Sequence, residues 1–459
     1  MSVNNGVVDF QEKNEKTLTV QVHENIKEDY SQSYIWYVIS LLAVVNAINY
    51  MDRYALSVLL PLIKEDLHLT DGQLGLLVGL AFSVFYAVCG VPIARWADQG
   101  NRRSIITLAM VVWSAMTAVS GAAQNFFHLF LARIGVGAGE AGCIPPGQSI
   151  ISDYVPVEGR PIAHAVHSFG SVIGLMVGMM LAGWLGDIIG WRWAFVALAI
   201  PGFLMAVIVR LTLIEPSRGL SDGYQGHIGG DAIPLKEAIG YLRSCRSYVI
   251  IVQFFAVNGF LQAALMQWMP SFYERSHILS ASEIGFYLGP ALGIGSGAGL
   301  LLGGALSARL AAKDISLPLK VGAVGVAIAL PALIGFLLAP TPDLSFLFAF
   351  VAWVFLSVSG GPVVAAVQSV VMPATRATAS AIAIFFTSVL GFGLGPFFVG
   401  IVSDFIAAYY GVESLRYAML STLVLIPFMV ILLYRASGTL NADLGEINQI
   451  GKQITEYRN

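Results

Sequence analysis

Residues 69–75 read LTDGQLG, and residues 279–285 read LSASEIG. The second heptapeptide repeats the pattern of the first 210 residues later, and two further matches follow in the same order in both parts of the chain. They are Arg160-x-x-Ala163-x-Ala165 with Arg376-x-x-Ala379-x-Ala381, and Gly174, Gly178, Gly183 and Asp187 with Gly391, Gly395, Gly400 and Asp404. Three matches in register predict a duplicated unit.

Composition places these repeats in a membrane. Of the 459 residues, 56% are apolar and only 12% are charged, whereas soluble domains average about 25% charged. This excludes a soluble globular enzyme and a disordered protein, and the net charge of −3 gives no basic surface for nucleic acid. The cysteines Cys89, Cys143 and Cys245 have no disulfide or metal-ligand spacing. No catalytic residue, metal or cofactor is therefore expected.

Long apolar runs predict the fold class. A bilayer core of about 30 Å needs about 20 apolar residues per helix, and runs without alternation are helices rather than barrel strands. Twelve such runs begin near Tyr34, Gly72, Ser104, Phe126, Ile162, Trp193, Ser247, Glu283, Leu317, Leu344, Thr378 and Tyr417. We expect an all-α membrane protein with twelve transmembrane helices in two pseudo-symmetric six-helix bundles. Pro145, Pro146, Pro290 and Pro362 are expected to bend helices.

The same runs divide the chain into five parts. A polar tail at 1–33 precedes the N-terminal bundle at 34–213, and a linker with an amphipathic helix at 214–246 precedes the C-terminal bundle at 247–434 and a tail at 435–459. With both tails in the cytosol, nineteen Lys and Arg residues fall on the cytosolic side and four outside. This bias predicts cytosolic termini.

Charged residues inside the runs are candidate functional groups, because they are costly in lipid. Asp52 and Arg53 lie in the first run, and Arg133 and Glu140 lie in the fourth. Neighbouring residues point about 100° apart on a helix, so we expect Arg53 to face Glu140, and Asp52 to face Arg133 or a polar group. Three roles stay open for these residues: proton coupling, a static ion-pair network, or binding of an anionic headgroup.

The loop at 94–103, ARWADQGNRR, resembles the loop between the second and third helices of the major facilitator superfamily. Asp98, Arg102 and Arg103 match that pattern, while Ala94, Gln99 and Asn101 depart from it. The resemblance implies that Asp98 latches the cytosolic side against a helix N-terminus near Arg376. The alternative is a solvated loop that only sets topology.

The superfamily resemblance also implies a central cavity lined by helices of both halves. From the second half we expect uncharged side chains there: Asn258, Gln262, Trp268, Gln368, Phe386 and Phe392. A cavity that is charged on one side and apolar on the other suits an amphipathic anion.

Three stretches resemble the spinster-like transporters: Asn49 to Arg53, the Arg133 to Ala141 segment, and Pro145 to Arg160. The resemblance implies a proton-coupled secondary transporter working by alternating access on a lysophospholipid or a sphingosine-1-phosphate-like lipid. It also implies that Asp52, Arg53, Arg133 and Glu140 serve coupling and headgroup binding.

Two alternatives remain, a small organic anion:cation symporter and a membrane sensor built on a transporter fold. The expected partners are the bilayer, a small amphipathic or anionic substrate and protons, with no nucleic acid. We expect a monomer in a bacterial inner membrane.

Overall fold

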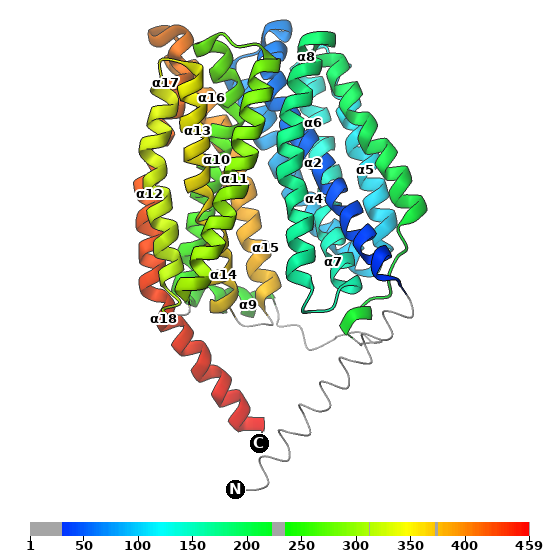
Figure 1. Cartoon of the computed structure of the whole chain (residues 1–459), viewed down its shortest axis with the longest axis vertical. Coiled ribbons are helices and arrows are strands. Elements are labelled where there is room, and N and C mark those ends of the chain that lie inside the picture. The colour runs from blue at the N-terminus through cyan, green and yellow to red at the C-terminus, as the bar shows by residue number, and fades with distance from the viewer. Residues whose placement is uncertain (1–29, 223–234, 312, 372–374, 459) are drawn as a thin grey trace.

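The computed structural model describes residues 30–222, 235–311, 313–371 and 375–458, which are helical apart from short connections and contain no strand (Figure 1). The helices of the first half are α2 (Gln32–Leu67), α3 (Asp71–Val78), α4 (Leu80–Gln99), α5 (Arg102–Ser120), α6 (Phe126–Glu140), α7 (Ile144–Tyr154) and α8 (Arg160–Thr212). The described part of the linker contains a 3-10 turn, η1 (Leu220–Asp222), and α9 (Leu235–Ser244).

The second half begins after α9. Its helices are α10 (Arg246–His277), α11 (Ala281–Ala311), α12 (Leu317–Leu338), α13 (Pro342–Ser357), α14 (Gly360–Val370), α15 (Arg376–Phe386), the π-helix η3 (Thr387–Gly393), α16 (Leu394–Tyr410), the 3-10 turn η4 (Gly411–Glu413), α17 (Ser414–Thr422) and α18 (Leu425–Arg458). The helix α18 continues through the residues expected to form a tail and projects beyond the bundle (Figure 1).

Nine helical stretches of the described chain are long and apolar enough to cross a membrane, and they account for eleven of the twelve predicted crossings. The helix α8 holds two crossings, because Gly190 with φ 76° turns the chain between them. The stretch Thr378–Gly445 likewise holds two, separated at Gly411 with φ 55°. The fourth crossing is divided into α6 and α7 by a turn at 141–143, so neither piece reaches the required length. The twelve-helix prediction is confirmed.

The two halves repeat each other in detail. The first helix of each half ends on a non-glycine residue with positive φ, His68 at 52° and Ile278 at 56°, 210 residues apart. The fourth crossing of each half is broken at its middle, before α7 in the first half and before α14 in the second. The duplicated sequence therefore folds into two bundles of the same design.

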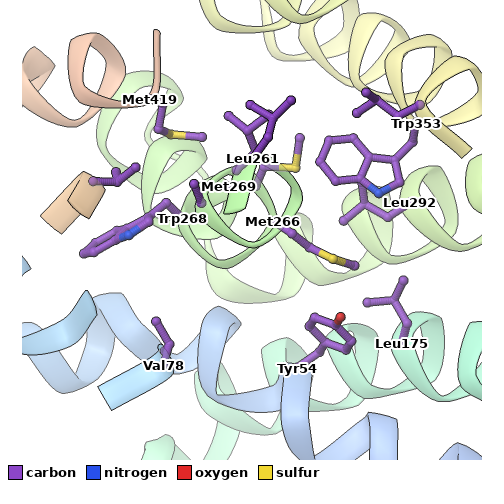
Figure 2. Packing of buried hydrophobic residues seen from close by; sticks show 14 of the residues in the cluster. Tyr54, Val78, Leu175, Leu261, Met266, Trp268, Met269, Leu292, Trp353 and Met419 are labelled. Carbon is purple, nitrogen blue, oxygen red and sulfur yellow. The ribbon is translucent and has the colours of Figure 1, made fainter. Parts of the chain in front are cut away.

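Apolar side chains fill the contact between the halves. Tyr54 of α2 and Leu175 of α8 face Met266 of α10 and Leu292 of α11 (Figure 2), and all four are buried. Within a bilayer such contacts hold helices together by close packing rather than by exclusion of water.

The two ends of the molecule differ, and we name them for what they carry. The linker end holds α9, the start of α2 and the far end of α18 (Figure 1). The distal end holds the turns at Gly190 and Gly411 and the connections that follow α2 and α10.

Candidate functional site

A cavity of about 450 Å³ lies between the halves. The first half contributes Tyr50, Arg53, Tyr54, Val78, Phe82, Ser83, Tyr86 and Ile144. The second half contributes Phe255, Gln267, Val364, Val367, Ser380, Ala383, Ile384, Thr387, Ser388 and Phe392. Of the described residues that line it, Arg53 is the one with a charge.

An ion pair holds Arg53 at the cavity wall. Its Nη2 and Nε donate to Oε2 of Glu140 at 2.6 and 3.1 Å, and Nη2 also lies 3.4 Å from Oδ1 of Asn49. Glu140 is fully buried, whereas the Arg53 side chain is partly exposed to the cavity. The expected pairing is confirmed, and it uses Nε and Nη2 of Arg53.

Aromatic rings surround the same guanidinium. Its central carbon lies 4.8 Å from the ring centre of Tyr50, 4.7 Å from that of Phe82 and 5.2 Å from that of Tyr86. Each such contact attracts a cation to the ring face. The rings therefore fix the direction of Arg53 in a way that a single carboxylate could not.

Asp52 and Arg133 lie deeper in the first half and are not hydrogen-bonded to each other in the described chain. Asp52 is buried, and neither of its carboxylate oxygens has a hydrogen-bond partner among the described residues. It lies beside Trp113 and Thr117 of α5, within the electrostatic influence of Arg133. Arg133 lies 5.2 Å from the centre of the Phe82 ring, and its Nε has no partner in the described chain. The expectation that Asp52 faces Arg133 or a polar group is met by the polar side chains of Trp113 and Thr117 on α5, while Arg133 packs on an aromatic ring.

The wall from the second half is apolar with a few hydroxyl groups and one amide. The amide belongs to Gln267 of α10, whose Oε1 accepts a hydrogen bond from the hydroxyl of Ser57 in α2. Ser57 and Gln267 are 210 residues apart, the spacing of the repeat, so equivalent positions of the two halves meet each other here. Sequence reasoning missed Gln267, although the repeat spacing pairs it with Ser57.

The residues of the second half that were predicted to line the cavity have different positions in the structure. Phe392 lines the cavity, and the side chain of Gln368 lies outside the described residues. Trp268 is a correction: it is fully buried in the core and its indole N–H donates to the carbonyl of Pro396 at 2.8 Å, because it points about 100° away from Gln267 on the helix.

Three further cavity-lining residues stay predictions. Asn258 and Gln262 bond to each other at 3.0 Å and are absent from the described cavity wall, as is Phe386. One helical turn between Asn258 and Gln262 places the two amides within reach of each other.

Two of the four predicted latch residues, Arg102 and Arg103, bind the start of the linker. Arg102 is buried and pairs with Asp153 and, at 2.7 Å, with Glu215, while the backbone N–H of Arg103 donates to Glu215 at 2.8 Å. Asp98 is exposed and has no ion pair with another described residue. The side chain of Arg376 lies outside the described residues. The latch stays a prediction.

Comparison with known proteins gives the family. Residues 42–391 match the Major Facilitator Superfamily. The chain is 33% identical over 391 residues to an MFS-type efflux pump of Mycolicibacterium smegmatis, covering 84% of this chain and 88% of that protein. It is 28% identical over 382 residues to Protein spinster of Drosophila melanogaster, covering 80% of this chain and 62% of that protein.

A solved structure agrees with this relationship. The crystal structure of a bacterial homolog to the human lysosomal transporter Spinster, in an inward-facing and unoccupied conformation, matches with a TM-score of 0.82 and 30% identity, covering 90% of this chain and 99% of that one. The spinster resemblance is confirmed, and the molecule is an integral multi-pass transporter rather than an enzyme. The chain belongs to the Major Facilitator Superfamily, with spinster proteins among its homologues.

Proposed function

We propose that this transporter is a proton-coupled secondary carrier of an amphipathic anion such as a lysophospholipid or a sphingosine-1-phosphate-like lipid. One observation carries the proposal: a single cavity has a guanidinium on the wall from the first half and mainly apolar side chains on the wall from the second. Its volume of about 450 Å³ is in the range of pockets that enclose small ligands.

The headgroup would bind at Arg53. A guanidinium can donate two parallel hydrogen bonds to a phosphate or carboxylate, and the Arg53 side chain lines the cavity and is partly exposed there. An anion arriving there would compete with Glu140 for the same cation. Binding of the substrate and the state of Glu140 would in this way depend on each other.

The acyl part would lie against the second half. Phe255, Val364, Val367, Ile384 and Phe392 present apolar surface, and the hydroxyls of Thr387 and Ser388 interrupt it. Such a wall favours a hydrocarbon chain over a compact hydrophilic anion. This contrast is the reason to prefer a lipid-like substrate over a small organic acid.

Two buried carboxylates are the proposed proton sites. A bare charge is costly at such depth, and Asp52 has no hydrogen-bond partner in the described chain to offset it. Glu140 is balanced by Arg53 only while that contact lasts. A proton taken up when the contact opens would link the pH gradient to the conformational change.

Orientation and location follow from the charge distribution. The nineteen-to-four bias of Lys and Arg supports a cytosolic linker end with both termini in the cytosol. We propose a monomer in a bacterial inner membrane.

The experiment has two stages. A thermal-shift screen of the purified chain against lysolipids, fatty acids and small organic anions identifies ligands, and flux into proteoliposomes is then measured with and without a pH gradient. We expect lysolipids to stabilise the protein and their flux to follow the gradient. Stabilisation by small organic acids alone would favour the symporter alternative. Binding without flux of any ligand would favour a sensor.

A further inference from the structure

A carboxylate of the second half caps a helix of the first at the distal end. Oδ1 and Oδ2 of Asp404, in α16, accept hydrogen bonds from the backbone N–H groups of Asp71 at 3.0 Å and Gly72 at 2.7 Å. These donors belong to the first turn of α3, where the helix itself supplies no acceptor. The next free donor, the N–H of Gln73, is bonded within the first half by Thr70. The cap is therefore shared between the two halves.

The equivalent contact exists with the halves exchanged. Asp187, in α8 of the first half, accepts a hydrogen bond at 2.8 Å from the backbone N–H of Ser282, in the first turn of α11. The N–H of Glu283 is bonded within the second half by Ser280 at 3.3 Å. Asp187 and Asp404 are the last residues of the two matching glycine–aspartate patterns of the repeat. Each accepts hydrogen bonds from the first turn of the second helix of the opposite half.

The contact at Asp404 has charged groups beside it that the contact at Asp187 lacks in the described chain. The carboxylate of Asp71 accepts two hydrogen bonds from Arg275 of α10 at 2.6 and 2.7 Å, and it also contacts Lys64 at 2.5 Å and the hydroxyl of Ser403 at 2.7 Å. Asp71 is buried, and its counterpart in the repeat is Ala281. The contact at Asp404 is thus reinforced by an ion pair between the halves, while the contact at Asp187 is not.

We propose that Asp187 and Asp404 are a duplicated gate that closes the distal end of the transport pathway. Both residues line a polar hollow of about 760 Å³ at that end, distinct from the central cavity. When the halves separate, water in this hollow can hydrate the freed N–H groups and carboxylates, so the contacts can open repeatedly. The inference rests on the proposed alternating access, and it assigns the closing contact to two named side chains.

The test reads the distance between the halves directly. Nitroxide labels are placed on Phe127→Cys and Tyr409→Cys, exposed positions in the first and second halves, in the full chain with Cys89→Ser; Cys143 and Cys245 are buried. Electron–electron double resonance is recorded in nanodiscs without substrate. We expect Asp404→Asn to raise the ratio of open to closed distal ends about tenfold, or about 1.4 kcal/mol, because the amide offers one acceptor to two donors.

Asp187→Asn should act in the same direction but less, since Asp187 accepts one N–H and an amide oxygen can still do so. The matched control is Asp66→Asn, which removes an acid whose partner, Arg192, belongs to the same half. Distance distributions of both gate variants that equal those of the control would overturn the proposal. If Asp404→Asn does not fold, Asp187→Ala replaces it. Because no cargo is needed, missing flux would count against the proposed function and leave the gate standing.

Discussion

At the scale of single residues, the site depends on how two buried acids are partnered. Glu140 is held by Arg53, whereas Asp52 has no hydrogen-bond partner among the described residues. The Arg53–Glu140 pair could be predicted because the spans of the sequence contain so few charges. The rings around Arg53 could not, since aromatic residues occur along the whole chain and no spacing distinguishes those that reach the cavity; Gln267 was missed, although the repeat spacing pairs it with Ser57.

Arg53→Lys should weaken substrate binding while the protein stays folded. Lysine keeps the charge but cannot donate the paired hydrogen bonds of a guanidinium or lie flat on the rings. Hydrogen bonds to charged groups contribute about 1.5–3 kcal/mol each, so affinity should fall at least tenfold. Titration of the best ligand from the thermal-shift screen measures this, with Arg95→Lys, at an exposed position of α4, as the control. Equal affinity in both variants would remove Arg53 from the headgroup site.

Glu140→Gln and Asp52→Asn should show separately how the two carboxylates affect the stability of the fold and the dependence of uptake on the pH gradient. Loss of Glu140 leaves Arg53 without its counter-ion, which costs up to about 3–5 kcal/mol when the cation is buried, so both the melting temperature and pH-driven uptake should fall. Asp52 has no ion-pair hydrogen bond to lose, so its variant should melt at or above the original temperature and lose only the pH response. Uptake that still follows the pH gradient in both variants would favour the static ion-pair network.

At the scale of helices, close approach depends on glycine. In α8, a Cβ on Gly174 would lie 2.8 Å from the carbonyl carbon of Ala47 in α2, whereas a Cβ on Gly297 of α11 would meet no atom within 4 Å. The glycine rows were visible in the sequence, but not which glycines touch a neighbour. The breaks before α7 and α14 lie next to Pro145, Pro146 and Pro362, as the sequence suggested, while Pro290 lies within a continuous α11.

Gly174→Ala should destabilise the first half, and Gly297→Ala should not. Overpacking typically costs about 1–3 kcal/mol, whereas alanine in an open helical position is favoured over glycine by up to about 1 kcal/mol. Melting temperatures in the same detergent give the comparison. A loss of stability as large for Gly297→Ala as for Gly174→Ala would show that spacing between helices is not the reason for the glycine row.

At the scale of the whole molecule, the two ends of the pathway use different contacts. The distal end is held by bonds between the halves, whereas Arg102 and Arg103 at the linker end bond to Glu215 at the start of the linker. The twelve-helix plan and its duplication were predictable from apolar runs and repeats. The conformation was not, because the proposed alternating access requires the same sequence to be stable with either end closed.

Asp98→Asn should shift the population toward the state open at the linker end, because the latch expected for the closed state would lose its charge. Accessibility of Val364→Cys, in the cavity wall, to a maleimide reagent reports this opening in the Cys89→Ser background. Glu158→Gln is the control, an exposed acid near the same end. A labelling rate for Asp98→Asn that matches the control would leave the loop with a topological role alone.

The uneven distribution of charge across the cavity has a consequence for how such carriers can diversify. The groups proposed to harness the ion gradient sit in one bundle, and the surface proposed to recognise cargo is largely supplied by the other. Substitutions at Val364, Ile384 or Phe392 would therefore change substrate selectivity while the proposed proton-coupling carboxylates stay unchanged. Related transporters with this arrangement can change their substrate by substitutions in the second half while the proton-coupling residues of the first half are kept.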